Sequence, residues 1–329
     1  MDENLAKIKL AALLLYDPSK GTPRDKDDPI FKHQDLISAY DDAKKAWNAL
    51  GVSSSFMKCS GLTVDNEIAD ILSHASGPNE AYLALYILYQ NIWLKNIDSN
   101  CDRMLDASYA ASSIAGSDRY YLVHFKISSV QDMIANSRKV SDLWAASYLY
   151  SILSWGTVLE FLNKFGPSSI LSPFIGSNPI YIYYAYGKIS SEQIKAKISE
   201  FAENTIGFAP PKDFLKYVPL PARVDLLIPT NWVQESDLLN KIAKNYKETW
   251  NRIYSELKNK FKLTGVKTSD ALDRLLDVAQ NIPPYPLIDL STRAVNVQDL
   301  VNDAAPGSSV NGKIWVDYGY GVAAAENEL

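Results

Sequence analysis

Apolar residues at the start of the chain recur at the spacing of one buried helix face. Ile8, Ala11, Ala12 and Leu15 follow the i, i+3, i+4, i+7 pattern, and Pro18 ends the predicted helix. Further helices are predicted over 32–50, 65–73, 79–95 and 100–115. The segment 79–95 is apolar nearly all round, which places it in the middle of a helical bundle. We therefore predict an all-helical domain over the first 117 residues.

The pattern changes at Arg119, after which β-branched and aromatic residues become frequent. Residues 120–127 (YYLVHFKI) predict a strand. Ser128 and Ser129 follow it and predict the N-cap of a long helix over 130–165. Further strands are predicted over 170–174, 180–186 and 222–228, and further helices over 190–203 and 236–262.

Residues 119–265 thus follow the order strand, long helix, strand, insertion, strand, long helix. This is the order of a ferredoxin-like split βαβ unit with an insertion, so we predict an α+β fold. Beyond it we predict a helix over 269–280, a proline-rich stop over 283–286 and a polar, irregular tail. The predicted divisions of the chain are 1–117, 118–265, and a helical linker and tail over 266–329.

The charge balance and the scarcity of cysteine and histidine exclude several classes of function. The 329 residues include 33 Lys and Arg against 38 Asp and Glu, a formal net charge of −5. A free-standing, non-specific nucleic-acid binder normally needs a basic surface, so that class is disfavoured, whereas binding through a local patch stays open. Cys59 and Cys101 are too far apart for a Cys-x-x-Cys motif, and three histidines leave few options for a histidine-based metal centre.

The N-terminal segment has a short apolar core behind acidic residues. It lacks the basic start and the small-residue cleavage site of a signal peptide. No stretch reaches the roughly 18 apolar residues that span a bilayer. We therefore expect a cytoplasmic protein without membrane contact.

The segment 125–155 carries a dense motif, FKISSVQDMIANSRKVSDLWAASYLYSILSW. It resembles the first palm domain in the large subunit of Cmr-type (type III-B) CRISPR effector complexes, whose pattern is V-Q-x-F-I-x-x-x-R-K-x-x-D-L-W-x-G-S-Y-L. Met133 replaces the Phe of that pattern and Ala146 replaces the Gly. The matching residues are Val130, Gln131, Ile134, Arg138, Lys139, Asp142, Leu143, Trp144, Ser147, Tyr148 and Leu149.

The flanking segments agree with this resemblance. Gly176-Ser177-Asn178-Pro179 is similar to an R-G-N-P turn of the family, with Ser177 altering the motif. Residues 11–18 (AALLLYDP) resemble A-A-L-L-H-D-P in the family's N-terminal HD region. The resemblance implies a degenerate HD-like domain over 1–117 and a first palm domain over 118–265. Residues 315–329 are similar to the start of the helix that leads to the family's zinc ribbon, which is absent here.

The resemblance also implies partners and an activity. The family assembles with other Cmr subunits on a CRISPR RNA and responds to target RNA. The whole family member makes cyclic oligoadenylate from ATP, with divalent metal bound at a Gly-Gly-Asp-Asp turn of a second palm, and some members cut single-stranded DNA. No Gly-Gly-Asp-Asp sequence occurs in this chain. We therefore expect a scaffolding subunit that is not itself catalytic and holds no tightly bound cofactor. Another interpretation is a helical adaptor unrelated to CRISPR, which predicts a bundle in place of a sheet over 119–265.

The HD resemblance implies a metal-binding His-Asp pair, but Tyr16 stands at the histidine position beside Asp17. A neutral phenol is a poor metal ligand compared with imidazole. His33 and Asp102 are the remaining candidates, and one imidazole with distant carboxylates makes a poor site for two metal ions. We therefore predict an HD remnant without metal. The alternative is a metal-dependent HD-type phosphohydrolase acting on single-stranded DNA through Asp17, His33 and Asp102.

A second candidate site lies at the start of the helix predicted over 130–165, which carries the family motif and is called the signature helix below. Helix N-terminal N–H groups and a planar guanidinium both suit the phosphate of nucleotide or RNA. Arg138 and Lys139 can equally pair with Asp142, four and three residues later. Trp144 and Tyr148, further along, are predicted to pack in the core. The candidate phosphate contacts are Ser128, Ser129, Gln131, Arg138 and Lys139.

Overall fold

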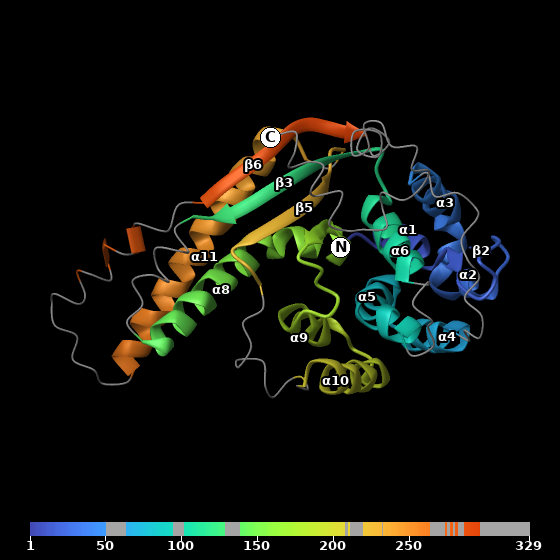
Figure 1. Cartoon of the computed structure of the whole chain (residues 1–329), viewed down its shortest axis with the longest axis horizontal. Helices are drawn as coiled ribbons and strands as arrows, with labels where there is room; N and C mark the ends of the chain where they lie inside the picture. The colour runs from blue at the N-terminus through green and yellow to red at the C-terminus, as the bar shows by residue number, and fades with distance from the viewer. Residues whose placement is uncertain are drawn as a thin grey trace.

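The computed structural model describes residues 1–50, 64–94, 102–128, 139–207, 210, 220–231, 233–263 and 286–296, with the isolated positions 274, 277, 278, 280 and 281. It combines helices with an antiparallel sheet, as predicted (Figure 1). Within these residues no helix has the length and apolar character needed to cross a membrane.

The N-terminal part consists of helices around the buried helix α5. The element bounds are α1 (Glu3–Leu14), β1 (Tyr16–Asp17), β2 (Thr22–Pro23), α2 (Pro29–Lys32), η1 (His33–Ala39), α3 (Tyr40–Ala49), α4 (Val64–His74), α5 (Pro78–Leu94) and α6 (Asp102–Ile114). Tyr82, Tyr86 and Tyr89 of α5 are buried, which confirms the predicted central position of this helix. The single helix predicted over 32–50 is wrong, because Gln34 and Asp35 adopt positive φ values of 53° and 54° and break it into α2, η1 and α3.

A four-stranded sheet forms the second part of the molecule. Its order is β4 (Ile170–Ser172), β5 (Arg223–Pro229), β3 (Arg119–Ile127) and β6 (Pro286–Asn296), and all neighbouring strands are antiparallel. The predicted strands over 120–127 and 222–228 correspond to β3 and β5, which pair with Phe125 opposite Val224 and Tyr121 opposite Ile228. The presence of this sheet contradicts the helical-adaptor interpretation.

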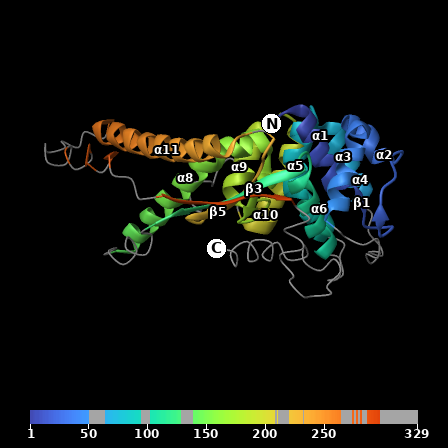
Figure 2. The ribbon, with the colours of Figure 1, turned by 90° about the horizontal axis from the view of Figure 1, so that it is seen from above.

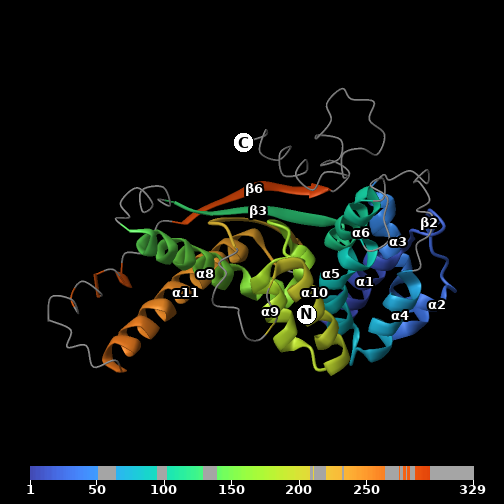
Figure 3. The same ribbon diagram turned by 60° about the horizontal axis from the view of Figure 1, so that its bottom comes forward.

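Two long helices lie along one face of the sheet (Figure 3). They are α8 (Val140–Phe165) and α11 (Glu235–Leu263), which pack against each other, and Tyr246 of α11 contacts Phe125 of β3 with ring centroids 5.9 Å apart. Because Phe125, Val224 and Leu226 are fully buried, the apolar residues of the central strands supply the core beneath the helices. The insertion between β4 and β5 holds α9 (Pro179–Lys188) and α10 (Glu192–Ile206).

Three further predicted elements differ from the structure. Residues 180–186 form helix α9 and not a strand, because Asn178 caps it by accepting from Ile180 N at 3.0 Å and Pro179 suits the first helical position. The irregular tail predicted after the proline-rich stop contains strand β6, which pairs with β3. The helix predicted over 130–165 begins at Val140, because Lys139 is extended, and its predicted first part lies outside the described residues, as does most of 269–280.

The exposed position of Trp144 also contradicts the sequence analysis. Its side chain is 51% exposed and stacks on Tyr148 with ring centroids 5.2 Å apart. Trp144 lies on the second turn of α8, and Figure 2 shows that this end of α8 projects away from the N-terminal helices. The aromatic pair is therefore a surface feature of the signature helix.

Close contact between α8 and α11 depends on Gly156. A Cβ atom at this position would overlap the side chain of Thr249 on α11. Gly156→Ala is expected to lower the free energy of unfolding by about 1–2 kcal/mol through overpacking, although alanine favours helix more than glycine does. Gly187→Ala in α9 is the matched control, because a Cβ there meets no atom within 4 Å. Denaturant unfolding of both variants tests this, and equal or greater stability of Gly156→Ala would contradict it.

Candidate functional site

Tyr16 fills the position that the resemblance assigns to a metal-binding histidine. It is buried in β1 and stacks on Trp47 of α3, with ring centroids 5.7 Å apart and an interplanar angle of 18°. The Trp47 indole donates in turn to the Ala12 carbonyl at 2.7 Å. Burial, with a smaller contribution from Asp17, raises the pKa of the Tyr16 phenol well above its ordinary value. Tyr16 is therefore a neutral core residue.

Asp17 is buried beside Tyr16 and is held by the loop that follows it. Its Oδ1 accepts from Ser19 N at 2.9 Å and from Ser19 Oγ at 2.6 Å, and Lys20 Nζ lies 2.9 Å from its Oδ2. Burial alone would raise the pKa of this carboxyl, but the hydrogen bonds from Ser19 and Lys20 and the charge of Arg24 outweigh burial and hold it below its ordinary value. Asp17 is thus an anion with partners inside its own chain.

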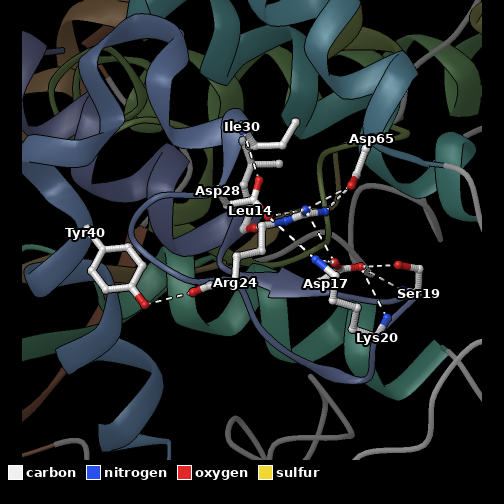
Figure 4. Close-up of polar contacts among 9 residues, drawn as sticks. All are labelled: Leu14, Asp17, Ser19, Lys20, Arg24, Asp28, Ile30, Tyr40 and Asp65. Atoms are coloured by element: carbon white, nitrogen blue, oxygen red, sulfur yellow. Dashed lines mark hydrogen bonds and ion pairs between the residues drawn. The ribbon is translucent and has the colours of Figure 1, made fainter.

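Arg24 is the buried centre of this region, with a side chain 1% exposed (Figure 4). Its guanidinium pairs with both carboxylate oxygens of Asp65 at the start of α4 and donates to Asp28 Oδ2 at 3.3 Å. Asp17 Oδ2 lies 3.7 Å from Arg24 Nη1, and Arg24 Nε donates to the Leu14 carbonyl at 3.1 Å. Although burial opposes the charge, the contacts with Asp65 and Asp17 raise the pKa of Arg24. Sequence analysis did not single out Arg24 or Asp65.

The other predicted members of the HD remnant do not join Tyr16 and Asp17. His33 is half-buried in η1, and none of the hydrogen bonds or ion pairs found among the described residues links its side chain to Asp17. Asp102 begins α6, but its side chain lies outside the described part of the structure. Among the described residues, no three His, Cys, Asp or Glu side chains are grouped so that they could hold a metal ion.

These residues do not fit the metal centre that the HD resemblance implies. An imidazole ligand is replaced by a buried phenol, and the three carboxylates that do converge meet a guanidinium. A divalent ion needs direct oxygen contacts at about 2.0–2.6 Å. The Arg24 guanidinium already occupies the space between Asp17, Asp28 and Asp65, where an ion would have to bind. These residues therefore support no metal chemistry.

The proposed phosphate contacts are placed only in part. Ser128 directly follows β3, and Lys139 is exposed at the N-cap of α8, without a side-chain capping bond. Ser129, Gln131 and Arg138 lie outside the described residues. The predicted pairing of Arg138 with Asp142 is therefore not tested.

A buried polar pair on the sheet was not anticipated. His124 of β3 and Asp225 of β5 are directly opposite each other, and their Nδ1 and Oδ1 atoms are 2.7 Å apart. Arg223 Nε lies 3.4 Å from the same oxygen. The sequence analysis predicted that residues 120–127, which include His124, form a strand, and this is confirmed. Its partner Asp225 is 101 residues away along the chain, so local patterns could not reveal the pair.

The part of the chain that matches a known protein family runs from β3 to α11. Residues 122–255 match the family model described as "CRISPR-associated protein Cmr2, N-terminal". The chain is 26% identical over 215 residues to the CRISPR system CMR subunit Cmr2 of Saccharolobus solfataricus, covering 54% of this chain and 21% of that protein. It is 37% identical over 73 residues to the Cmr2 subunit of Pyrococcus furiosus, covering 22% and 8%.

Solved structures show the same fold. A chain of the type III-B Cmr-beta structure in the apo state matches with a TM-score of 0.65 at 18% identity, over 98% of this chain and 40% of that one. In the Cmr-beta structure bound to cognate target RNA, the TM-score is 0.64 at 17% identity, over 90% and 38%. The chain thus spans about a fifth or less of the curated relatives and about two fifths of the structural ones. Residues 122–255 therefore match the Cmr2 N-terminal family model, and the resemblance to the N-terminal part of the large subunit of Cmr-type CRISPR complexes is confirmed.

Proposed function

We propose that this chain serves as the N-terminal part of a Cmr2-type large subunit, with a scaffolding role in an RNA-guided type III-B antiviral complex. The observation that carries the proposal is that the family match begins in β3 and ends in α11. The matched residues therefore include all of β5 and α8 and most of β3 and α11. The fold match to Cmr-beta over nearly the whole chain supports the same role for the N-terminal helices.

The domain assignment follows from this role. Strand order β4-β5-β3-β6 with helices after β3 and β5 is the arrangement of a ferredoxin-like split βαβ unit, which supports a first palm domain. Because β6 pairs with β3, the proposed palm extends from 118 to 296, beyond the boundary at 265 predicted from the sequence. The helices of 1–117 form the proposed HD-like domain, and the rest of the predicted linker and tail, after residue 296, lies outside the described residues.

The proposed partners are the other subunits of a Cmr complex and, through them, CRISPR RNA and target RNA. Support comes from the Cmr-beta relative, whose structure is known with cognate target RNA. Ser128, Ser129, Gln131, Arg138 and Lys139 remain the proposed contacts for RNA or nucleotide phosphate. In this proposal ATP and divalent metal are bound by other parts of the full-length family member and not tightly by this chain.

The second candidate function, an HD-type phosphohydrolase on single-stranded DNA, receives less support. It needs a metal held by Asp17, and the structure shows this carboxylate beside Arg24 and Lys20. It needs His33 and Asp102 as further ligands, and His33 makes no contact with Asp17 among the described residues. We therefore expect no manganese-stimulated DNA cleavage that is lost on Asp17→Ala.

Co-purification tests the proposed role. The tagged full chain is co-expressed with the other subunits of a Cmr complex, with and without a CRISPR RNA, and the recovered particle is sized by analytical ultracentrifugation. We expect a stoichiometric assembly that contains the chain and the guide RNA. Recovery of the chain alone, from cells in which the other subunits assemble, would contradict the proposal.

Trp144→Ala should separate assembly from stability. Because the indole is half exposed and, among the described residues, stacks on Tyr148 of its own helix, we expect Tm to change by no more than about 2 °C, as for most surface substitutions. Large exposed aromatic residues are frequent binding hot spots, so recovery of the assembled complex should fall at least about tenfold. Tyr183→Ala, which removes a 37% exposed aromatic residue on α9, is the control and should assemble normally. Normal assembly of Trp144→Ala would remove this residue from the proposed interface.

A further inference from the structure

Three carboxylates from separate parts of the N-terminal domain converge on one guanidinium. Asp17 is the last residue of β1, Asp28 caps α2, and Asp65 lies on the first turn of α4. Each has an oxygen within 3.7 Å of an Arg24 nitrogen, and Figure 4 shows the arginine between them. The arrangement places three negative charges around a buried cation.

The position of Arg24 is built into the main chain. Arg24 N donates to the Leu15 carbonyl at 2.6 Å, and the Arg24 carbonyl accepts from the Tyr40 hydroxyl at 2.8 Å. The side chain is anchored again by Nε, which donates to the Leu14 carbonyl at the end of α1. Hydrogen bonds to main-chain and hydroxyl groups therefore hold both the backbone and the guanidinium of Arg24, independently of the three carboxylates.

We propose that Arg24 is an internal cation that takes the place of a metal ion, gathering Asp17, Asp28 and Asp65 and excluding divalent cations from them. A guanidinium stays charged in proteins and offers five N–H donors in a rigid plane, so it can serve several carboxylates at once. Asp17 Oδ2 faces both Arg24 and Lys20, so two positive charges oppose the entry of a divalent ion at this oxygen. The result is a domain whose acidic residues hold its loops together and do no metal chemistry.

The arginine also connects elements that are distant in sequence. Its contacts link the end of α1, the loop over 17–28 and the first turn of α4, 41 residues after Arg24. An ion that replaced the guanidinium would have to supply this connection as well as the charge. The role of Arg24 can therefore be tested by removing its guanidinium and supplying a divalent ion.

The test uses the full chain and Mn²⁺ as the probe. Arg24→Met keeps the length and the apolar stem but removes the cation, and we expect Tm to fall by about 5 °C because three carboxylates lose their shared partner. These carboxylates are not grouped as a metal site while Arg24 lies between them. Without the guanidinium they are left without a cation, so saturating Mn²⁺ should restore at least half of that loss, since a ligand bound only by the folded state stabilises it. Adding Asp65→Asn to Arg24→Met should abolish the Mn²⁺ effect, and Arg24→Lys should be intermediate in Tm and insensitive to Mn²⁺.

Calorimetric titration of the unmodified chain provides an arm that does not depend on whether Arg24→Met folds. We expect no saturable Mn²⁺ binding that differs between the wild-type chain and Asp17→Asn. Saturable binding that is lost in Asp17→Asn would overturn the proposal, as would an Arg24→Met protein whose Tm ignores Mn²⁺. Neither outcome bears on assembly, so failure here is distinguishable from failure of the proposed scaffolding role.

Discussion

Replacing Glu80 by alanine is expected to lower the free energy of unfolding by about 4 kcal/mol, because several buried donors lose their acceptor. Glu80 is buried at the start of α5. It accepts from Ser190 N at 3.0 Å, Ser190 Oγ at 2.8 Å and Ser191 N at 2.8 Å, and also from the amide and hydroxyl of Ser76. It thereby ties the N-terminal helices to the turn that precedes α10. Differential scanning calorimetry should show Tm lower by about 10 °C.

Glu192→Ala is the matched control for Glu80→Ala. This carboxylate lies on the first turn of α10, is 80% exposed, and pairs only with Lys195 among the described residues, so its removal should change stability by less than about 0.5 kcal/mol. Burial raises the pKa of Glu80, but the hydrogen bonds from Ser76, Ser191 and Ser190 prevail and lower it. The contribution of Glu80 is therefore present above the ordinary carboxyl pKa and is lost as pH falls through the lowered one. Equal effects of the two substitutions would contradict this account.

Lys9→Met is expected to remove a large pH dependence of stability. Lys9 is fully buried in α1, and burial lowers its pKa to about 7. Its ammonium donates to the Ser112 and Ser113 carbonyls at 3.0 and 3.2 Å and to Ser168 Oγ at 3.0 Å, and no ion pair to it is found in the described part of the chain. The three donors are satisfied by neutral oxygens, so the charge is hydrogen-bonded without a counter-ion.

The sign of the effect follows from proton binding. Between pH 7 and the ordinary lysine value the unfolded chain binds the proton more tightly than the folded chain, so the stability of the wild-type protein should rise with pH. From pH 7 to 9.5 the gain relative to Lys9→Met should be roughly 3 kcal/mol. Urea unfolding at both values measures it. A wild-type and a Lys9→Met protein with parallel pH profiles would show that Lys9 keeps its ordinary pKa.

Hydrophobic patterning predicted most helices, and the frequency of β-branched and aromatic residues predicted the two central strands, which are buried along most of their length. Residues 180–186 were misassigned because Ile and Tyr favour strands, whereas the Asn178-Pro179 helix start outweighed that preference. Strand β6 was missed behind a proline-rich stop, although the polar residues Asp289 and Ser291 alternate with the apolar residues Ile288 and Leu290. Its pairing with β3 is a tertiary contact that local patterns do not encode.

The candidate sites show a similar division. The motif correctly pointed to the Cmr2 family, whereas the HD remnant without metal, inferred from Tyr16 at the histidine position, stays a prediction. Arg24 escaped notice because its partner Asp65 is 41 residues away, on another helix. Trp144 was assigned to the core because its spacing from Tyr148 is helical, but it is half exposed near the end of α8 that projects away from the N-terminal helices (Figure 2).

A cryo-EM reconstruction of the chain co-assembled with Cmr subunits, a CRISPR RNA and target RNA tests the central claim most directly. We predict that β3, α8, β5 and α11 occupy the position of the matched chain in the Cmr-beta structure, with the Trp144 end of α8 against a neighbouring subunit. A complete complex from which this chain is missing, or in which these elements lie elsewhere, would contradict the account.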